Sequence, residues 1–449
     1  MLERIFKIKE RNSTVQREVI AGITTFLAMA YILAVNPNYL SAAGIPIGAA
    51  FSATAISAGI ATLCMAFFAN YPIALASGMG LNAFFAFTVC GAMGYSYKVA
   101  LTAVFVEGII FIVISAFKFR EAIINALPAN LKFAISAGIG LFISFIALLG
   151  SGIVVSDSAT TVAMGDLSSA PVVLSIVGFL IVAALVHFKV PGGILIGIIA
   201  TWLLGMGAEL IGWYVVDPEA GVYSVIPSFS SEAFSLPLFF DFDFGFVVKN
   251  LPAFLLIVFT FLYTDIFDTV GTLVGVTEKA DLLDKDGKLP NATGAFMADA
   301  VGTTVGAVLG TSTVTSYVES TAGVAAGGKT GFASVITSLL FFASLILAPI
   351  FTAIPSFATT PAMLYVGLLM LSSIKKVKFD SDIADTVGAF MAIVMMPLTY
   401  SIANGIMFGM LSWVILKLIT GKVKDISPVM WISVALFALY IGLKVAGLA

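Results

Sequence analysis

The stretch that decides the fold is "VTSYVESTAG", residues 314–323, because it places the carboxylate of Glu319 inside an otherwise apolar segment. The residues just before the acid, "TSTVTSY" at 311–317, are β-branched or small, which favours extended backbone over helix. Extended backbone at membrane depth is tolerated only where protein or a water-filled cavity satisfies its hydrogen bonds. The stretch therefore predicts an interrupted span, with about five or six extended residues leading into a half-helix.

A second stretch has the same character. Residues 71–89, "YPIALASGMGLNAFFAFTV", carry Pro72, Gly78 and Gly80 before the amide of Asn82. Two such segments would satisfy each other's backbone and would aim two half-helix N-termini at one point in the membrane.

Composition places these stretches in a membrane protein. The 449 residues are 60% hydrophobic and 10% charged, with a mean hydropathy of +1.09, whereas soluble chains are about 45–50% apolar and about 25% charged. A bilayer needs roughly 20 apolar residues per helical span. We expect an all-α polytopic protein, with no nucleic-acid partner at a net charge of −3.

Fourteen apolar runs of span length are predicted, as two sets of seven. They fall at 19–40, 48–69, 73–91, 98–117, 131–150, 169–188, 191–212, 249–275, 294–310, 311–328, 330–352, 359–374, 384–400 and 402–420. Seven spans followed by seven begin on opposite sides of the membrane, which is the arrangement of an inverted repeat. A further stretch, 428–446, is either another span or an interfacial helix.

The distribution of basic residues orients the chain. With a cytoplasmic N-terminus, alternation of fourteen spans puts all Lys and Arg inside except Lys98, Lys249 and Lys444. The two longest external connections, 151–168 and 213–248, contain neither Lys nor Arg. We expect a multi-pass protein of the cell membrane.

Carboxylates within spans mark the candidate chemistry, since each costs about 2.5–3.5 kcal/mol on insertion scales. None has an evident Lys or Arg at the same depth, which makes them suitable proton carriers. The candidates are Glu107, Asp265, Asp268, Asp299, Glu319 and, near a span end, Asp385.

The spacing and neighbours of these polar residues predict different roles for them. Asp265 and Asp268 lie one helical turn apart and are expected to face one cavity, with Thr272 four residues further on. The alternative is that one Asp only satisfies backbone groups of a broken helix. Asn82 either offers a ligand a donor and an acceptor, or forms only an interhelical hydrogen bond.

The remaining acids also have two interpretations. Glu319 binds a ligand or caps the half-helix, although Ser316 is available for capping. Asp299 either joins the ninth span to the eighth or touches a ligand, and Glu107 is best explained by a structural bond across helices. His187 is the single histidine, so neither a metal site nor a cofactor is expected.

The chemistry of the predicted site limits the kind of ligand that it can bind. Carboxylates, an amide and hydroxyls without a fixed cation suit a neutral molecule rich in N–H donors, and nearby aromatic residues such as Phe84 and Tyr317 suit a planar ring. A nucleobase meets this description, and protonation of one carboxylate provides a coupling step. The predicted substrate-binding residues are Asn82, Phe84, Asp268, Thr272, Ser316, Val318 and Glu319, and the predicted proton-coupling residues are Asp265, Asp268, Asp299 and Glu319.

Five motifs carry a resemblance over essentially the whole chain. They are "GITTFLAMAYILAVNPNYL", "ASGMGLNAFFAF", "FDTVGTLVGV", "MADAVGTTVGAVLGTSTVTSYVESTAGVAAGGKTG" and "IANGIMFG". The chain resembles the azaguanine-type purine permeases, a branch of the nucleobase–cation symporter-2 (nucleobase–ascorbate transporter) family.

The resemblance implies a fourteen-helix fold like that of the uracil permease. It implies a core domain from residues 1–130 and 249–352, a gate domain from 131–248 and 353–449, and a base held between the third and tenth spans. Asp268 and Glu319 match the family's base-binding acids, and Asp299 matches an acid of its ninth span.

Two further positions match the family pattern, and one departs from it. Asn82 and Asp265 match polar positions of the purine branch. Thr272 stands where some relatives carry His, so the carboxylates are left as proton carriers.

The resemblance also implies a function: import of adenine, guanine, hypoxanthine or xanthine with protons, by movement of core against gate, in a homodimer. Sodium coupling, a small-anion transporter of the same fold and a channel remain as alternatives. An enzyme is not expected, since no nucleophile–base set or metal ligands are evident. The sequence does not rank the purines.

Overall fold

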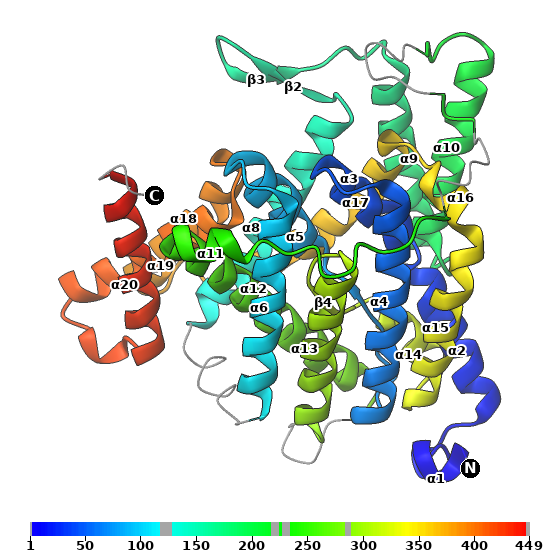
Figure 1. Ribbon diagram of the computed structural model, residues 1–449, viewed down its shortest axis with the longest axis horizontal. Helices are drawn as coiled ribbons and strands as arrows, with labels where there is room; N and C mark the ends of the chain where they lie inside the picture. Colours follow the sequence, from blue (N-terminus) through cyan, green and yellow to red (C-terminus); the bar gives the residue numbers. More distant parts are fainter. Residues whose placement is uncertain (1, 117–127, 217–223, 227–233, 283–288, 446–449) are drawn as a thin grey trace.

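The computed structural model describes residues 2–116, 128–216, 224–226, 234–282 and 289–445, and these are mostly helical (Figure 1). The first half contains α1 (Leu2–Phe6), α2 (Val15–Met29), α3 (Ile32–Ala42), α4 (Ile47–Phe68), β1 (Leu75–Ser77), α5 (Met79–Ala83), the π-helix η1 (Phe84–Ala92), α6 (Tyr97–Ala116), α8 (Ala129–Gly150), β2 (Val154–Asp157), β3 (Thr161–Met164), α9 (Ala170–His187) and α10 (Gly193–Leu210).

The second half begins with α11 (Phe244–Lys249), α12 (Leu251–Lys279), α13 (Ala292–Leu309), β4 (Val314–Ser316) and α14 (Ser320–Ala325). It continues with α15 (Gly331–Ala343), η4 (Ser344–Leu347), α16 (Ala348–Thr352), α17 (Ser356–Leu371), η5 (Ser372–Lys376), α18 (Ile383–Leu398), α19 (Ile402–Ile419), η6 (Val423–Asp425) and α20 (Pro428–Val445).

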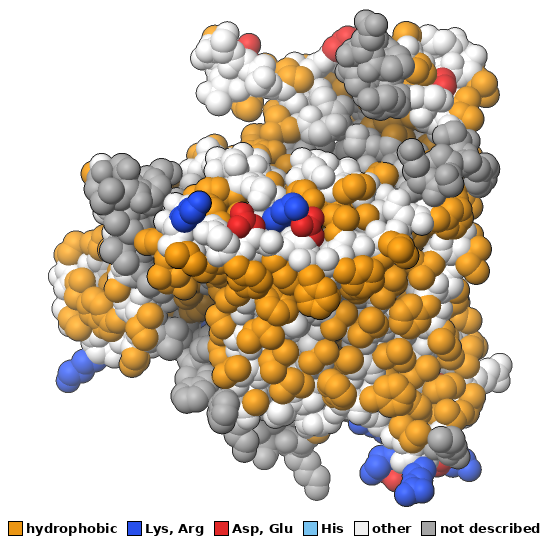
Figure 2. All heavy atoms as spheres, in the orientation of Figure 1, with side chains coloured by type: hydrophobic (Ala, Val, Ile, Leu, Met, Phe, Trp, Pro, Cys, Tyr) orange, Lys and Arg blue, Asp and Glu red, His pale blue; other side chains and the backbone are white. Residues whose placement is uncertain are grey.

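Eleven helical segments of the described chain are long and apolar enough to cross a membrane. They coincide with eleven of the predicted spans. The other three ranges, 73–91, 311–328 and 384–400, hold shorter elements: β1 with α5 and η1, β4 with α14, and α18. The protein is thus a mostly helical membrane protein, and Figure 2 shows apolar side chains in a broad band with charged side chains along its upper edge and at its lower corner.

The two interrupted ranges meet as the sequence predicts. β1 and β4 pair in antiparallel fashion, with Leu75 opposite Ser316 and Ser77 opposite Val314. The ladder continues on both sides, where Gly78 N–H donates to the Thr313 carbonyl at 3.0 Å and Tyr317 N–H donates to the Ala74 carbonyl at 3.0 Å. The regular strands have three residues each, and with these flanking bonds the paired extended segments cover 74–78 and 313–317, five residues each, in agreement with the five or six predicted.

Side chains from neighbouring elements satisfy the rest of this backbone. Leu75 N–H donates to Thr62 Oγ1 at 3.0 Å, and Ala74 N–H donates to Ser320 Oγ at 3.0 Å. The preceding helix α13 ends at Gly310, whose φ of 91° is readily adopted only by glycine and turns the chain out of the helix. The strand pair is therefore closed on itself and on α4 and α14.

The helices pack in two groups. α2, α3, α4, α6, α12, α13, α14 and α15 pack mainly on one another and surround the strand pair, whereas α8, α9, α10, α17, α18 and α19 pack together beside them. The undecided stretch 428–446 forms the helix α20, which lies at the outer edge of Figure 1 and contacts α19 and α12.

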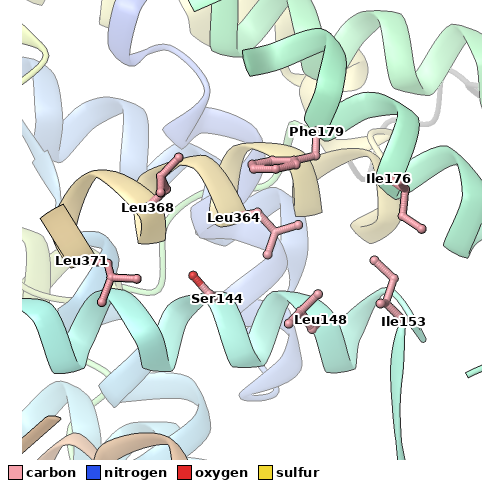
Figure 3. Close-up of a pocket in the computed structure, with 8 residues that line it drawn as sticks. All are labelled: Ser144, Leu148, Ile153, Ile176, Phe179, Leu364, Leu368 and Leu371. Atoms are coloured by element: carbon pink, nitrogen blue, oxygen red, sulfur yellow. The ribbon is translucent and has the colours of Figure 1, made fainter. Parts of the chain in front are cut away.

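A cavity of about 350 Å³ lies within the second group, between α8, α9 and α17 (Figure 3). Its lining is apolar except for Ser144, and Ile176 and Leu368 at its rim are 39% and 49% exposed. This cavity is lined by none of the predicted site residues and is not the candidate site.

The close contact of α14 with α2 gives a stability prediction. A Cβ on Gly323 would overlap Thr25 Oγ1 and come within 2.6 Å of the Ala21 carbonyl oxygen. We expect Gly323→Ala to destabilise the protein by about 1–3 kcal/mol, measured as a lower thermal unfolding temperature of the purified protein. Gly207→Ala on α10 is the control, because nothing lies within 4 Å of its Cβ position. Equal unfolding temperatures for the two variants would contradict the packing described.

Candidate functional site

Glu319 lies between β4 and α14. It occupies the position before the helix, with φ −59° and ψ −19°, but its side chain makes no capping hydrogen bond. Instead its Oε1 accepts a hydrogen bond of 2.7 Å from the hydroxyl of Tyr31. The capping interpretation of Glu319 is therefore wrong, and the carboxylate faces the junction of α2 and α3.

Asp268 on α12 is the second acid of this site. It is partly exposed and has no hydrogen-bond partner among the described residues. The charge of Glu319 acts on Asp268, and both acids act on the buried phenols of Tyr31 and Tyr317. Two carboxylates and two phenols thus share one region, with Thr272 buried one turn along α12.

Asn82 ties the two interrupted segments together. Its Nδ2 donates to the Ser77 carbonyl at 3.3 Å, and its Oδ1 accepts from the Ser312 hydroxyl. The Tyr317 hydroxyl donates to the same Ser77 carbonyl at 2.5 Å. These contacts fix the geometry of the strand pair beside the acids.

The other predicted substrate-binding residues do not all lie beside these acids. Val318, next to Glu319, is 49% exposed. Phe84 is 1% exposed and packs edge-to-face on Phe261, with ring centroids 4.8 Å apart. Ser316 donates its hydroxyl to Asp299 at 3.1 Å and so points away from the Glu319 carboxylate.

A second set of acids lies deeper in the protein, beside the strand pair. Glu107 on α6, Asp265 on α12 and Asp299 on α13 are all 0% exposed. Their hydrogen-bond donors are hydroxyls: Thr269 lies 2.6 Å from Asp299 and 3.5 Å from Asp265, Thr303 lies 3.5 Å from Asp265, and Thr313 lies 3.4 Å from Glu107. No salt bridge to any of the three is found within the described ranges.

Asp265 and Asp268 differ in exposure although their charges interact, and that they face one cavity stays a prediction. Three residues along a helix return the side chain to a neighbouring position rather than the same one, and here the difference separates two environments. Asp265 is 0% exposed and is acted on by Glu107, while Asp268 is partly exposed and the charge of Glu319 acts on it.

Some site residues were missed by the sequence reasoning. Tyr31 lies at the break between α2 and α3, and its only signal was a phenol within the first apolar span. Thr269, Thr303 and Thr313 were missed because threonine is common in such helices and gives no distinct pattern. Among the described residues, no group of three or more His, Cys, Asp or Glu is suited to holding a metal ion.

Comparison with known proteins identifies the family. The sequence pattern of the Permease family (Xan_ur_permease) matches residues 16–436 of this chain. The chain belongs to this family, the nucleobase–cation symporter-2 family. The resemblance in the sequence motifs is thereby confirmed, and the members of the family are transporters, not enzymes.

The permease is also similar to curated relatives along its whole length. It is 39% identical over 442 residues to the adenine permease AdeP of Escherichia coli, covering 98% of this chain and 96% of that protein. It is 42% identical over 451 residues to the guanine/hypoxanthine permease PbuG of Bacillus subtilis, covering 98% and 99%.

Solved structures with a similar fold are more distant in sequence. The transmembrane domain of the cyanobacterial bicarbonate transporter BicA matches with a TM-score of 0.67 at 15% identity, covering 87% of this chain and 97% of that one. SLC26A9 matches with a TM-score of 0.66 at 11% identity, covering 93% and 67%. At such identities the likeness concerns the fold of the permease alone.

The contact between Tyr31 and Glu319 gives a prediction for transport. Tyr31→Phe removes a hydrogen bond to a carboxylate, which is worth about 1.5–3 kcal/mol. We expect the apparent KM for the transported substrate to rise roughly 10- to 100-fold, measured by initial uptake rates in cells. Tyr365→Phe on α17, in the second helix group, should leave KM unchanged. An unaltered KM in Tyr31→Phe would show that the hydrogen bond does not shape the site.

Proposed function

We propose that this permease imports purine nucleobases together with protons. The observation that carries the proposal is the pair of carboxylates, Asp268 and Glu319, placed at the strand pair without a cation acting on either among the described residues. Such a site suits a neutral ring with N–H donors. The names of the relatives, adenine permease and guanine/hypoxanthine permease, point to the same class of substrate.

In this proposal the two acids accept hydrogen bonds from ring or exocyclic N–H groups of the base. Tyr31 orients the Glu319 carboxylate, since its hydroxyl already donates to Oε1 at 2.7 Å. Asn82 acts by positioning, because both ends of its amide are engaged with the strand pair. Val318 and Thr272 lie beside the acids and limit the space for the base.

The proposed transport cycle uses the two helix groups as core and gate domains. The core is assigned to residues 1–130 and 249–352, the gate to 131–248 and 353–449, and the core carries the base past the gate by an elevator-like movement. Fourteen spans as two inverted sets of seven, a cytoplasmic N-terminus in the cell membrane and a homodimer complete the proposal. The packing of α8, α9, α10, α17, α18 and α19 apart from the strand pair supports this division.

A small-anion transporter is the main rival, because the similar solved structures include a bicarbonate transporter. An anion needs a fixed cation or free donors at its site. The described surroundings of Asp268 and Glu319 offer acids and phenols instead, so the site favours a neutral donor-rich ligand. Sodium in place of the proton changes the coupling ion but not the substrate class.

Uptake of labelled purines into cells tests the proposed function. We expect accumulation that depends on the proton gradient and is competed by unlabelled purines, at two pH values and with or without sodium. Glu319→Gln should reduce uptake at least about 100-fold, because a charged acceptor of N–H groups is replaced by a neutral amide, while Glu10→Gln, at an exposed residue of the N-terminal segment, should not. No accumulation of any purine by intact protein in the membrane would contradict the proposal.

A further inference from the structure

A pair of buried carboxyl groups lies outside the proposed base site. Glu107 on α6 and Asp265 on α12 are each 0% exposed, and their carboxyl groups are within hydrogen-bonding reach of each other. Glu107 accepts from Thr313 at 3.4 Å through Oε2, while its Oε1 meets no hydroxyl, amide or main-chain donor among the described residues. The unpartnered oxygen and the neighbouring acid together indicate that one of the two carboxyl groups carries a proton and donates it to the other.

The chemistry of two touching carboxyl groups supplies that hydrogen. A carboxylate only accepts hydrogen bonds, whereas a protonated carboxyl donates one. Two carboxyl groups in contact therefore hold at least one proton, and they hold it firmly where water is excluded and like charges cannot both persist.

The groups that face this pair are all acidic or neutral. Asp299 on α13 and Asp268 on α12 act on it electrostatically, and Glu319 acts on Asp268. Thr269, Thr303 and Thr313 contribute hydroxyls. No Lys, Arg or His acts on the pair within the described part of the chain, so a proton is the positive charge that balances it.

We propose that Glu107 and Asp265 form the site of the coupling proton, distinct from the acids that hold the base. The inference rests on the proposed function, which supplies the transport cycle. A proton from external water forms an O–H bond in the pair. That bond breaks on the cytoplasmic side, and the proton passes to water and leaves a carboxylate.

The link to the base site runs along α12. Asp265 lies three residues before Asp268, and the charges of the two acids interact. When a base binds at Asp268 and Glu319, it changes the electrostatic potential at Asp265. The affinity of the Glu107–Asp265 pair for its proton changes as a result. Glu107 is thus a positioning and proton-holding residue that does not touch the base.

The test separates coupling from binding with Glu107→Gln. The amide can still hydrogen-bond to Asp265 but cannot gain or lose the proton. In proteoliposomes we expect equilibrium purine binding and purine–purine exchange within about twofold of wild type, and accumulation driven by an imposed pH gradient reduced at least about tenfold. Glu10→Gln should match wild type in all three measurements.

Two results would overturn the inference while leaving the proposed function intact. One is a Glu107→Gln protein that accumulates purine with the wild-type response to the pH gradient. The other is a protein in the membrane that loses binding and exchange as well, which indicates a structural role. Wild-type accumulation driven by sodium alone would instead defeat the proton coupling of the proposed function, and this inference with it.

A second measurement decides the matter if Glu107→Gln is not recovered from membranes. The infrared spectrum of the wild-type protein at neutral pH should contain the carbonyl band of a buried protonated carboxyl, and Asp265→Asn should weaken it. Absence of the band from wild type, or an unchanged band in Asp265→Asn, would overturn the inference.

Discussion

The hydrogen-bonding demand of extended backbone inside a membrane is the constraint on which this structure depends. Residues 75–77 and 314–316 leave the helical conformation in a region where water does not compensate. Their pairing as β1 and β4, with Thr62 and Ser320 supplying further partners, meets that demand. The pair in turn packs against α3, α4, α12 and α13 and bonds to Ser320 of α14, so it helps to hold these helices in place.

This arrangement also explains why the acids occur where they do. The strand pair gathers hydroxyls and main-chain groups at membrane depth, so a carboxylate placed beside it finds donors that lipid would not provide. Two sets of acids lie beside the strand pair. Glu319 and Asp268 lie with two phenols near the half-helix α14, while Glu107, Asp265 and Asp299 are enclosed among threonine hydroxyls. We propose that the first set holds the base and the second holds the coupling proton.

Much of this plan could be predicted from the sequence, because interrupted spans have a distinctive composition. The β-branched run before Glu319 and the glycines before Asn82 predicted the paired segments correctly. The different exposures of Asp265 and Asp268 could not be predicted from a three-residue spacing, and the phenol of Tyr31 did not indicate its partner, which is 288 positions away.

The central claim is that the strand pair presents Glu319 and Asp268 to a purine. The most direct measurement is an experimental structure of the protein with a saturating purine. We expect a planar density beside the β4–α14 junction, with the carboxylates of Glu319 and Asp268 at hydrogen-bonding distance from ring or exocyclic nitrogens. A purine bound elsewhere, such as in the apolar cavity between α8, α9 and α17, with both carboxylates free of it, would contradict the account.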